Sequence, residues 1–151
     1  MKKKETSQFA EISVNYKTRK KFNEMPHIDN SQASEQLFRE IWSTRMEHVE
    51  EMYMILLNNA NKSLGYSKIS IGGTTATLVD VKIIFQTALM GNASAFIIAH
   101  NHPSGNTKPS ESDIILTRKI QAAGEIMEIK LLDHLILTKE EYISMIDEEI
   151  I

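Results

Sequence analysis

The feature that most constrains this chain is a short apolar run that ends in two histidines. Residues 95–99 read Ala-Phe-Ile-Ile-Ala, and a His-Asn-His sequence follows directly. A run this short and this rich in β-forming residues predicts a buried strand. Residues i and i+2 of a strand point to the same face, so His100 and His102 are expected to converge on one point. A Pro-Ser-Gly sequence at residues 103–105 then turns the chain.

A helix is predicted to begin at Ser110, and Asp113 lies in its first turn. With Ser110 as N-cap and an acid three residues later, the pair fits a capping arrangement that needs no metal. Alternatively, Asp113 joins His100 and His102, because two imidazoles and a carboxylate are a plausible zinc set that leaves the fourth position to water. The two interpretations are compatible, since a helix start can hold Asp113 rigid while its carboxylate faces a metal.

The spacing of these residues resembles a known signature. A His-x-His-Pro sequence beginning at His100, with seven residues between His102 and Ser110 and then Ser-x-x-Asp, resembles the motif of the JAMM (MPN-type) zinc metallopeptidases. The surrounding sequence is similar to the RadC family, and this resemblance runs from about Ser31 to the C-terminus. The RadC-like segments are residues 57–62, 72–74, 100–105, 109–110 and 132–136.

The resemblance implies a zinc-dependent hydrolase that cuts an amide or isopeptide bond of a peptide or protein substrate. It implies that His100, His102 and Asp113 hold zinc, which lowers the pKa of a bound water to about 7. It also implies that Ser110 donates a hydrogen bond to the oxyanion of a tetrahedral intermediate. In JAMM enzymes an upstream glutamate is the general base, and the RadC pattern places this residue at Glu50.

Strand parity decides between Glu50 and its neighbour. In the predicted strand Glu50 shares a face with Met52, whereas Glu51 shares the other face with Tyr53. A slip of one residue would select Glu51 instead, and Glu47 is a more distant candidate. A solvated acidic patch is the alternative for all three glutamates.

A second apolar segment, residues 129–137, is interrupted by Asp133 and His134. A charged pair in a buried strand costs free energy unless partners satisfy it. The pair could contact the zinc site or a substrate, or it could form a buried Asp–His hydrogen bond that braces the sheet. We favour the bracing role, since the ligand set is complete without His134.

Length and composition narrow the class of protein. The 151 residues predict one domain, and the net charge of −3 gives no support to a nucleic-acid partner. The absence of cysteine excludes disulfides, Cys-containing zinc sites and the nucleobase deaminases. No apolar run approaches the ~18–20 residues of a membrane span, and no signal peptide is recognised. We therefore expect a cytoplasmic protein with no membrane partner.

The chain is expected to consist of a polar arm, residues 1–30, and a RadC-like JAMM/MPN domain, residues 31–151. Within the arm, Val14 and Tyr16 could form a short edge strand and scattered basic residues could contact nucleic acid, but a loosely packed arm is the simpler expectation. Proteins of the RadC type have carried a DNA-repair label, so the resemblance also implies a possible role in DNA repair. A non-catalytic MPN scaffold and a nucleic-acid accessory protein are the alternatives to an enzyme, and no oligomeric state follows from the sequence.

Helices and strands are predicted to alternate. The expected helices are residues 31–42, 80–90, 110–123 and 140–146, and the expected strands are residues 52–57, 64–71, 95–99 and 129–137. The first two strands predict an antiparallel hairpin. This order predicts an α/β sandwich with a mixed sheet. The resemblance implies the same MPN-like (cytidine-deaminase-like) architecture, a mixed curved β-sheet flanked by helices.

Overall fold

The structure, a computed structural model, describes residue 10 and residues 12–72 and 79–151. The Gly-Thr end of the RadC-like segment 72–74 therefore lies outside the described residues, as do residues 1–9 and 11 of the arm. In chain order the elements are η1 (Phe22–Glu24), α1 (Ser31–Ile41), β1 (Glu51–Leu57), β2 (Ser63–Ile71), α2 (Val81–Met90), β3 (Ala95–Asn101), α3 (Glu111–Met127), β4 (Lys130–Leu137) and β5 (Tyr142–Ser144). Within the described ranges, no helix is long and apolar enough to cross a membrane.

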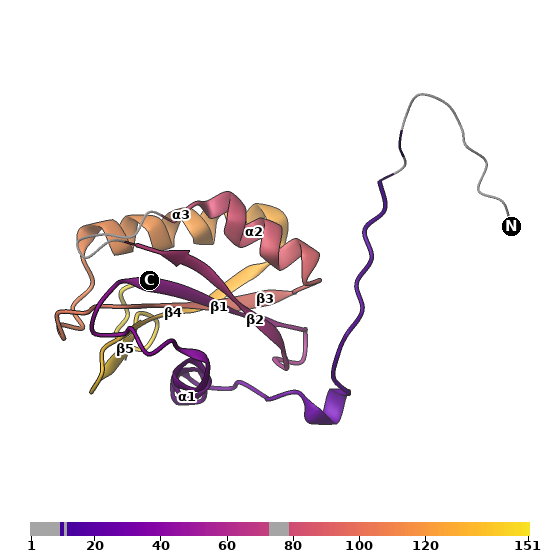
Figure 1. Cartoon of the computed structure of the whole chain (residues 1–151). Coiled ribbons are helices and arrows are strands. Elements are labelled where there is room, and N and C mark those ends of the chain that lie inside the picture. The colour runs from indigo at the N-terminus through magenta and orange to yellow at the C-terminus, as the bar shows by residue number, and fades with distance from the viewer. Residues whose placement is uncertain (1–9, 11, 73–78) are drawn as a thin grey trace, which may run out of the picture.

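One five-stranded sheet in the order β2-β1-β3-β4-β5 forms the centre of the domain. β1 pairs antiparallel with both β2 and β3, β3 pairs parallel with β4, and β5 pairs antiparallel with β4. Helices α2 and α3 cover one face of the sheet, and α1 packs against the other (Figure 1). The predicted mixed α/β sheet flanked by helices, and the hairpin formed by its first two strands, are confirmed.

Side-chain alternation along β1 sorts the apolar residues into two cores. Met52 and Met54 pack with residues of α2 and α3. Tyr53 and Ile55 point the other way and pack with Phe38 of α1. All seven residues of β1 and all seven of β3 are buried, so a side chain at the end of either strand is held by a rigid interior element.

The helix predicted over residues 140–146 is wrong. Tyr142–Ser144 form the strand β5, which pairs with the end of β4. A tight turn returns the chain: the N–H of Thr138 donates to the carbonyl oxygen of Glu141 at 2.8 Å, and the Thr138 hydroxyl accepts from the N–H of Glu141 at 3.0 Å. The backbone hydrogen bonds offered by the edge of β4 override the helical pattern of this acidic segment, because propensity is only a weak preference.

Helix α3 continues one turn beyond its predicted end at Ala123, to Met127. Gly124 lies where the helix approaches the start of β4. A Cβ built at this glycine would lie 2.5 Å from the carbonyl oxygen of Ile129, which is closer than two such atoms can pack. Glycine here permits the close approach of helix and strand, and it does not end the helix.

The last residues of the predicted arm, before residue 31, pack against the domain. Val14 and Tyr16 belong to no strand, and Val14 is exposed. In contrast, Met25 and Ile28 are buried, and the N–H of Ile28 donates to the carbonyl oxygen of Asn61 at 2.9 Å. The contact between residues 25–28 and the β1–β2 turn anchors the arm to the sheet.

Candidate metal centre

Three polar side chains from β3 and α3 converge at the carboxyl end of β3. His100 lies within β3, His102 follows the strand, and Asp113 lies in the first turn of α3. The Nε2 atoms of the two histidines are 2.9 Å apart. Asp113 Oδ1 lies 3.2 Å from His100 Nε2, and Asp113 Oδ2 lies 3.5 Å from His102 Nε2.

These separations suit a metal ion. Ligand atoms about 2.1 Å from a tetrahedral zinc ion lie roughly 3.4 Å from one another, and the candidate ligand atoms here all lie within 4.8 Å of one another. Two imidazoles and one carboxylate also leave a fourth position for water. The structure therefore brings the three predicted ligands, His100, His102 and Asp113, into one group that a metal ion fits.

A capping box at the start of α3 fixes the Asp113 side chain. Ser110 Oγ accepts a hydrogen bond from the N–H of Asp113 at 3.1 Å, and Asp113 Oδ2 accepts from the N–H of Ser110 at 2.7 Å. The capping arrangement expected from the sequence is present. It orients the carboxylate so that Oδ1 remains directed toward His100.

The electrostatics of the group favour a cation beside Asp113. Burial acts to raise the pKa of Asp113, but hydrogen bonds with His100 and His102 together hold it well below its usual range. The pKa of His102 is raised, chiefly by its hydrogen bond with Asp113. An ionised carboxylate here is stabilised by the two opposing rings, a role that a metal cation can also fill.

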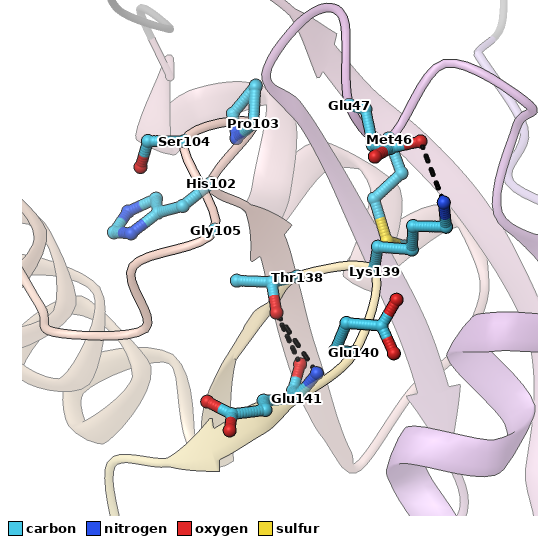
Figure 2. Close-up of a pocket in the computed structure, with 10 residues that line it drawn as sticks. All are labelled: Met46, Glu47, His102, Pro103, Ser104, Gly105, Thr138, Lys139, Glu140 and Glu141. Carbon is cyan, nitrogen blue, oxygen red and sulfur yellow. Dashed lines mark hydrogen bonds and ion pairs between the residues drawn. The ribbon is translucent and has the colours of Figure 1, made fainter.

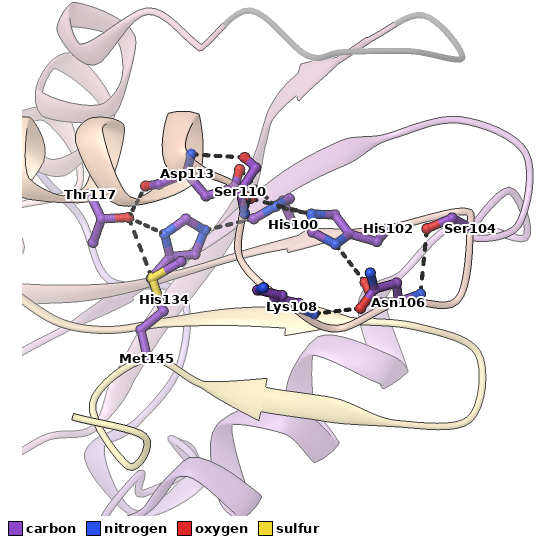
Figure 3. Close-up of polar contacts among 10 residues, drawn as sticks. All are labelled: His100, His102, Ser104, Asn106, Lys108, Ser110, Asp113, Thr117, His134 and Met145. Atoms are coloured by element: carbon purple, nitrogen blue, oxygen red, sulfur yellow. Dashed lines mark hydrogen bonds and ion pairs between the residues drawn. The ribbon is translucent and has the colours of Figure 1, made fainter. Parts of the chain in front are cut away.

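Each candidate histidine also forms a hydrogen bond through Nδ1, the ring nitrogen that faces away from the group (Figure 3). His102 Nδ1–H donates to the carbonyl oxygen of Asn106 at 2.7 Å. His100 Nδ1 lies 2.7 Å from Nε2 of His134, which is completely buried. Hydrogen bonds of this kind set the tautomer and orientation of metal-binding histidines, and here both rings turn Nε2 toward the group.

A family model described as RadC-like JAB domain matches residues 28–150. The chain belongs to this family. A UPF0758 protein of Flavobacterium johnsoniae is 46% identical over 101 residues, which are 67% of this chain and 44% of that protein. A UPF0758 protein of Thermosynechococcus vestitus is 47% identical over 96 residues (64% of this chain, 38% of that protein), and one of Porphyromonas gingivalis is 44% identical over 100 residues (66% and 44%). The chain spans less than half the length of these relatives.

Glu50 of this RadC-like domain directly precedes β1. It lies beside the group formed by His100, His102 and Asp113, called the metal group from here on. Met52 is paired with His100 in the antiparallel ladder of β1 and β3. Continuing that register by two residues sets Glu50 opposite His102, and Glu50 contributes to the raised pKa of His102. The N–H of Gly72 donates to the Glu50 carbonyl oxygen at 2.8 Å and fixes the backbone at this point.

Glu51 lies on the opposite face and is completely buried. Its carboxylate accepts hydrogen bonds from the Ser43 hydroxyl and, at 2.8 Å, from the ammonium group of Lys68. Glu47 is exposed and forms an ion pair with Lys139 at 3.5 Å. Of the three candidate bases, Glu50 is therefore the one on the same face as His100, and Glu51 has a structural ion pair.

Asn101 has a role that sequence reasoning missed. Its side chain points away from the two flanking histidines and is completely buried. Nδ2 donates to the carbonyl oxygens of Met46 and Val49 at 2.6 and 2.9 Å, and Oδ1 accepts from the N–H of Glu51 at 2.7 Å. Asn101 thereby fixes the segment that carries Glu50. Its signal in the sequence is an amide at an inward position of an apolar strand, since such a group needs partners.

The expected Asp–His side-chain pair in β4 is corrected by the structure. Asp133 accepts a hydrogen bond from the Ser144 hydroxyl at 2.6 Å and from the backbone N–H of His134 at 2.7 Å, and burial raises the pKa of Asp133. The ring of His134 points to the other face, where it contacts His100 and Thr117. Adjacent strand residues face opposite sides of the sheet, so the two side chains cannot pair.

An open cavity of about 420 Å³ adjoins the His102 side of the metal group (Figure 2). It lies between residues 102–105, residues 138–141 and the Met46–Glu47 segment. Four carboxylate or ammonium groups, those of Glu47, Lys139, Glu140 and Glu141, lie around it. Polar and charged side chains therefore line the cavity next to His102.

Proposed function

We propose that this RadC-like domain is a zinc-dependent hydrolase of the JAMM type that cleaves an amide or isopeptide bond in a peptide or protein. The observation that carries the proposal is the convergence of His100 Nε2, His102 Nε2 and Asp113 Oδ1 beside an open cavity. This donor set is one that catalytic zinc uses, and zinc held there would supply a water whose pKa is about 7.

Glu50 is the general base of the proposed reaction. It lies outside the ligand group, follows the face of β1 that points to His100, and acts electrostatically on His102. A carboxylate in this position can accept the proton of the attacking water and pass it to the leaving amine. Glu51 is unsuited to the role because its carboxylate is buried against Lys68.

Ser110 stabilises the oxyanion in this scheme. Its Oγ uses a lone pair to accept the capping hydrogen bond from the N–H of Asp113. The single hydroxyl hydrogen is not consumed by that bond, so it can be donated to a developing oxyanion. Loss of one such donor costs roughly 3 kcal/mol of transition-state stabilisation.

Zinc binding is the first experimental test. The metal-depleted protein is expected to bind one zinc ion per chain in a chelator competition titration, and His102→Ala should weaken the affinity by at least tenfold, because one of three ligands is lost. A parent protein that takes up no stoichiometric zinc would exclude the proposed reaction.

The general base is tested by Glu50→Gln, which keeps size and hydrogen bonding but removes basicity. Zinc affinity and melting temperature should stay at parental values, while turnover of fluorogenic peptide-amide and isopeptide substrates falls ~10²–10⁴-fold. Glu51→Gln should instead lower the melting temperature. Glu40→Gln, at an exposed position of α1, should change neither the melting temperature nor the turnover. Tight zinc binding with turnover that Glu50→Gln leaves intact would contradict the assignment of the base. Zinc binding with no turnover of any substrate would favour the non-catalytic scaffold.

A further inference from the structure

Two buried polar side chains lie behind the metal group and connect two of its members. His134 on β4 and Thr117 on α3 are both completely buried. His134 Nε2 lies 2.7 Å from His100 Nδ1, and His134 Nδ1 lies 2.6 Å from Thr117 Oγ1. Thr117 Oγ1 also lies 2.6 Å from the backbone carbonyl oxygen of Asp113. The chain of hydrogen bonds thus begins at His100 and ends at Asp113 (Figure 3).

The donor and the acceptor of each hydrogen bond in this series follow from the last bond, which joins Thr117 to the Asp113 carbonyl oxygen. A carbonyl oxygen only accepts, so the single hydroxyl hydrogen of Thr117 is donated to Asp113. Thr117 Oγ1 must then accept from His134 Nδ1–H. The Met145 sulfur, 3.6 Å from the hydroxyl, is a weak acceptor and does not compete with a carbonyl at 2.6 Å.

His134 is completely buried, and the partners of its two ring nitrogens are a hydroxyl group and an imidazole, not a carboxylate, so a positive charge on the ring would have no counter-charge in contact with it and the ring is neutral. A neutral ring protonated on Nδ1 carries a lone pair on Nε2. His134 Nε2 therefore accepts from His100 Nδ1–H. Nε2, the atom that faces His102 and Asp113, is then the ring nitrogen of His100 that is left to bind a metal or, in the metal-free protein, to donate to Asp113.

We propose that His134 and Thr117 are positioning residues that hold His100 as its Nδ1–H tautomer, with the Nε2 lone pair aimed at the metal. The two candidate histidines differ in how this is achieved. His102 donates to a backbone carbonyl, which fixes its tautomer by itself. The partner of His100 is another imidazole, which can donate or accept, so Thr117 is needed to fix the direction.

The proposal rests on the proposed zinc site for its purpose, but the hydrogen on His100 Nδ1 is set by bonds within the protein, with or without metal. It is measured on the whole metal-depleted protein by long-range ¹H–¹⁵N correlation spectra of the imidazole rings, which distinguish protonated from bare nitrogens. His134 and His100 are expected to carry hydrogen on Nδ1, and His134 to be bare on Nε2. A His134 ring protonated on Nε2 in the parent protein would overturn the inference.

The Thr117→Val variant removes the hydroxyl at nearly constant volume. We expect a population of His134 protonated on Nε2 and a zinc affinity lower by ~10–100-fold, the effect typical of losing an outer partner of a metal ligand. Thr117→Ser should restore both. Thr87→Val is the matched control, because Thr87 Oγ1 makes the same bond to a carbonyl four residues back, at 2.7 Å to Ile83, without touching an imidazole.

The outcomes separate this inference from the proposed function. A folded Thr117→Val protein with zinc affinity within twofold of the parent would overturn the positioning role. A parent protein that binds zinc but shows the reversed tautomers would overturn this inference and leave the proposed hydrolase standing. A parent protein that binds no zinc would overturn both.

Discussion

Asn101 provides the sharpest test of how the sheet holds the segment that precedes β1. Asn101→Ala removes three hydrogen bonds at once. The carbonyl oxygens of Met46 and Val49 lose their donor, and the N–H of Glu51 loses its acceptor. The histidines on either side face the opposite way, so the substitution does not touch the metal group directly.

The expected loss of stability is large. A typical hydrogen bond contributes ~1 kcal/mol net, and a buried backbone group left without a partner costs ~1–3 kcal/mol. Three groups together give about 3–9 kcal/mol, against a total stability of roughly 5–15 kcal/mol for a domain. Since 1 kcal/mol corresponds to roughly 2–4 °C in a chain of this size, the melting temperature should fall by roughly 6 °C or more.

Thermal unfolding followed by circular dichroism measures this loss, and zinc competition titration at a temperature where the variant is folded measures the metal group. Zinc affinity should stay within a few-fold of the parent value. Asn101→Asp is the matched variant: it keeps the acceptor for Glu51 but turns a carboxylate oxygen toward two carbonyl oxygens, so it should be at least as damaging. Exposed Asn59→Ala in the β1–β2 turn is the control. An Asn101→Ala protein that melts within 3 °C of the parent would refute the view that this amide holds the segment.

Two further predictions concern packing and protonation. Gly124→Ala should place a Cβ against the Ile129 carbonyl oxygen, an overpacking that costs about 1–3 kcal/mol and is offset by a helical gain of ~1 kcal/mol. A net loss of up to ~2 kcal/mol is expected, and unchanged urea unfolding would show that α3 can move away from β4. In the metal-depleted protein the folded state binds the proton of His102 more tightly than the unfolded state does, because its pKa is raised. Protonated His102 should therefore stabilise the fold fully below the ordinary pKa of 6.5, and this stabilisation should be lost as the pH rises through the raised pKa. Saturating zinc should reverse this slope, since zinc binds the deprotonated ring, and a pH series that is identical with and without zinc would contradict the prediction.

The metal group could be predicted from the sequence because every relationship within it is local. The apolar run before His100 predicts a strand, and the two-residue spacing puts His102 on the same face. The helix start at Ser110 fixes Asp113 through backbone hydrogen bonds that depend on a few neighbouring residues. The opposite faces of Glu50 and Glu51 follow from alternation in the same way.

The partners behind the group could not be selected from the sequence, which left a contact of His134 with the zinc site as one of two alternatives, because these partners depend on strands that meet across the sheet. His134 reaches His100 through the parallel pairing of β3 and β4, where it lies opposite Ile98, and that register shifts between Phe96 and Ile97. No pattern within β4 encodes the shift. The ion pair of Glu51 with Lys68 likewise depends on an irregular register between β1 and β2. Residues 140–146 show the opposite error. Their local sequence predicts a helix, but Tyr142–Ser144 pair with the edge of β4 instead.

The short span of the candidate ligands, residues 100–113, has a consequence for folding. A His-x-His pair survives in the unfolded chain, so metal affinity is retained there and zinc should raise stability by less than its native affinity alone implies. Closing so short a loop costs little entropy, which allows the ligands to gather early. Glu50 joins them only when β1 pairs with β3. A chain caught before that pairing would hold the candidate metal ligands without the proposed base, which would confine the proposed hydrolysis to the completed fold.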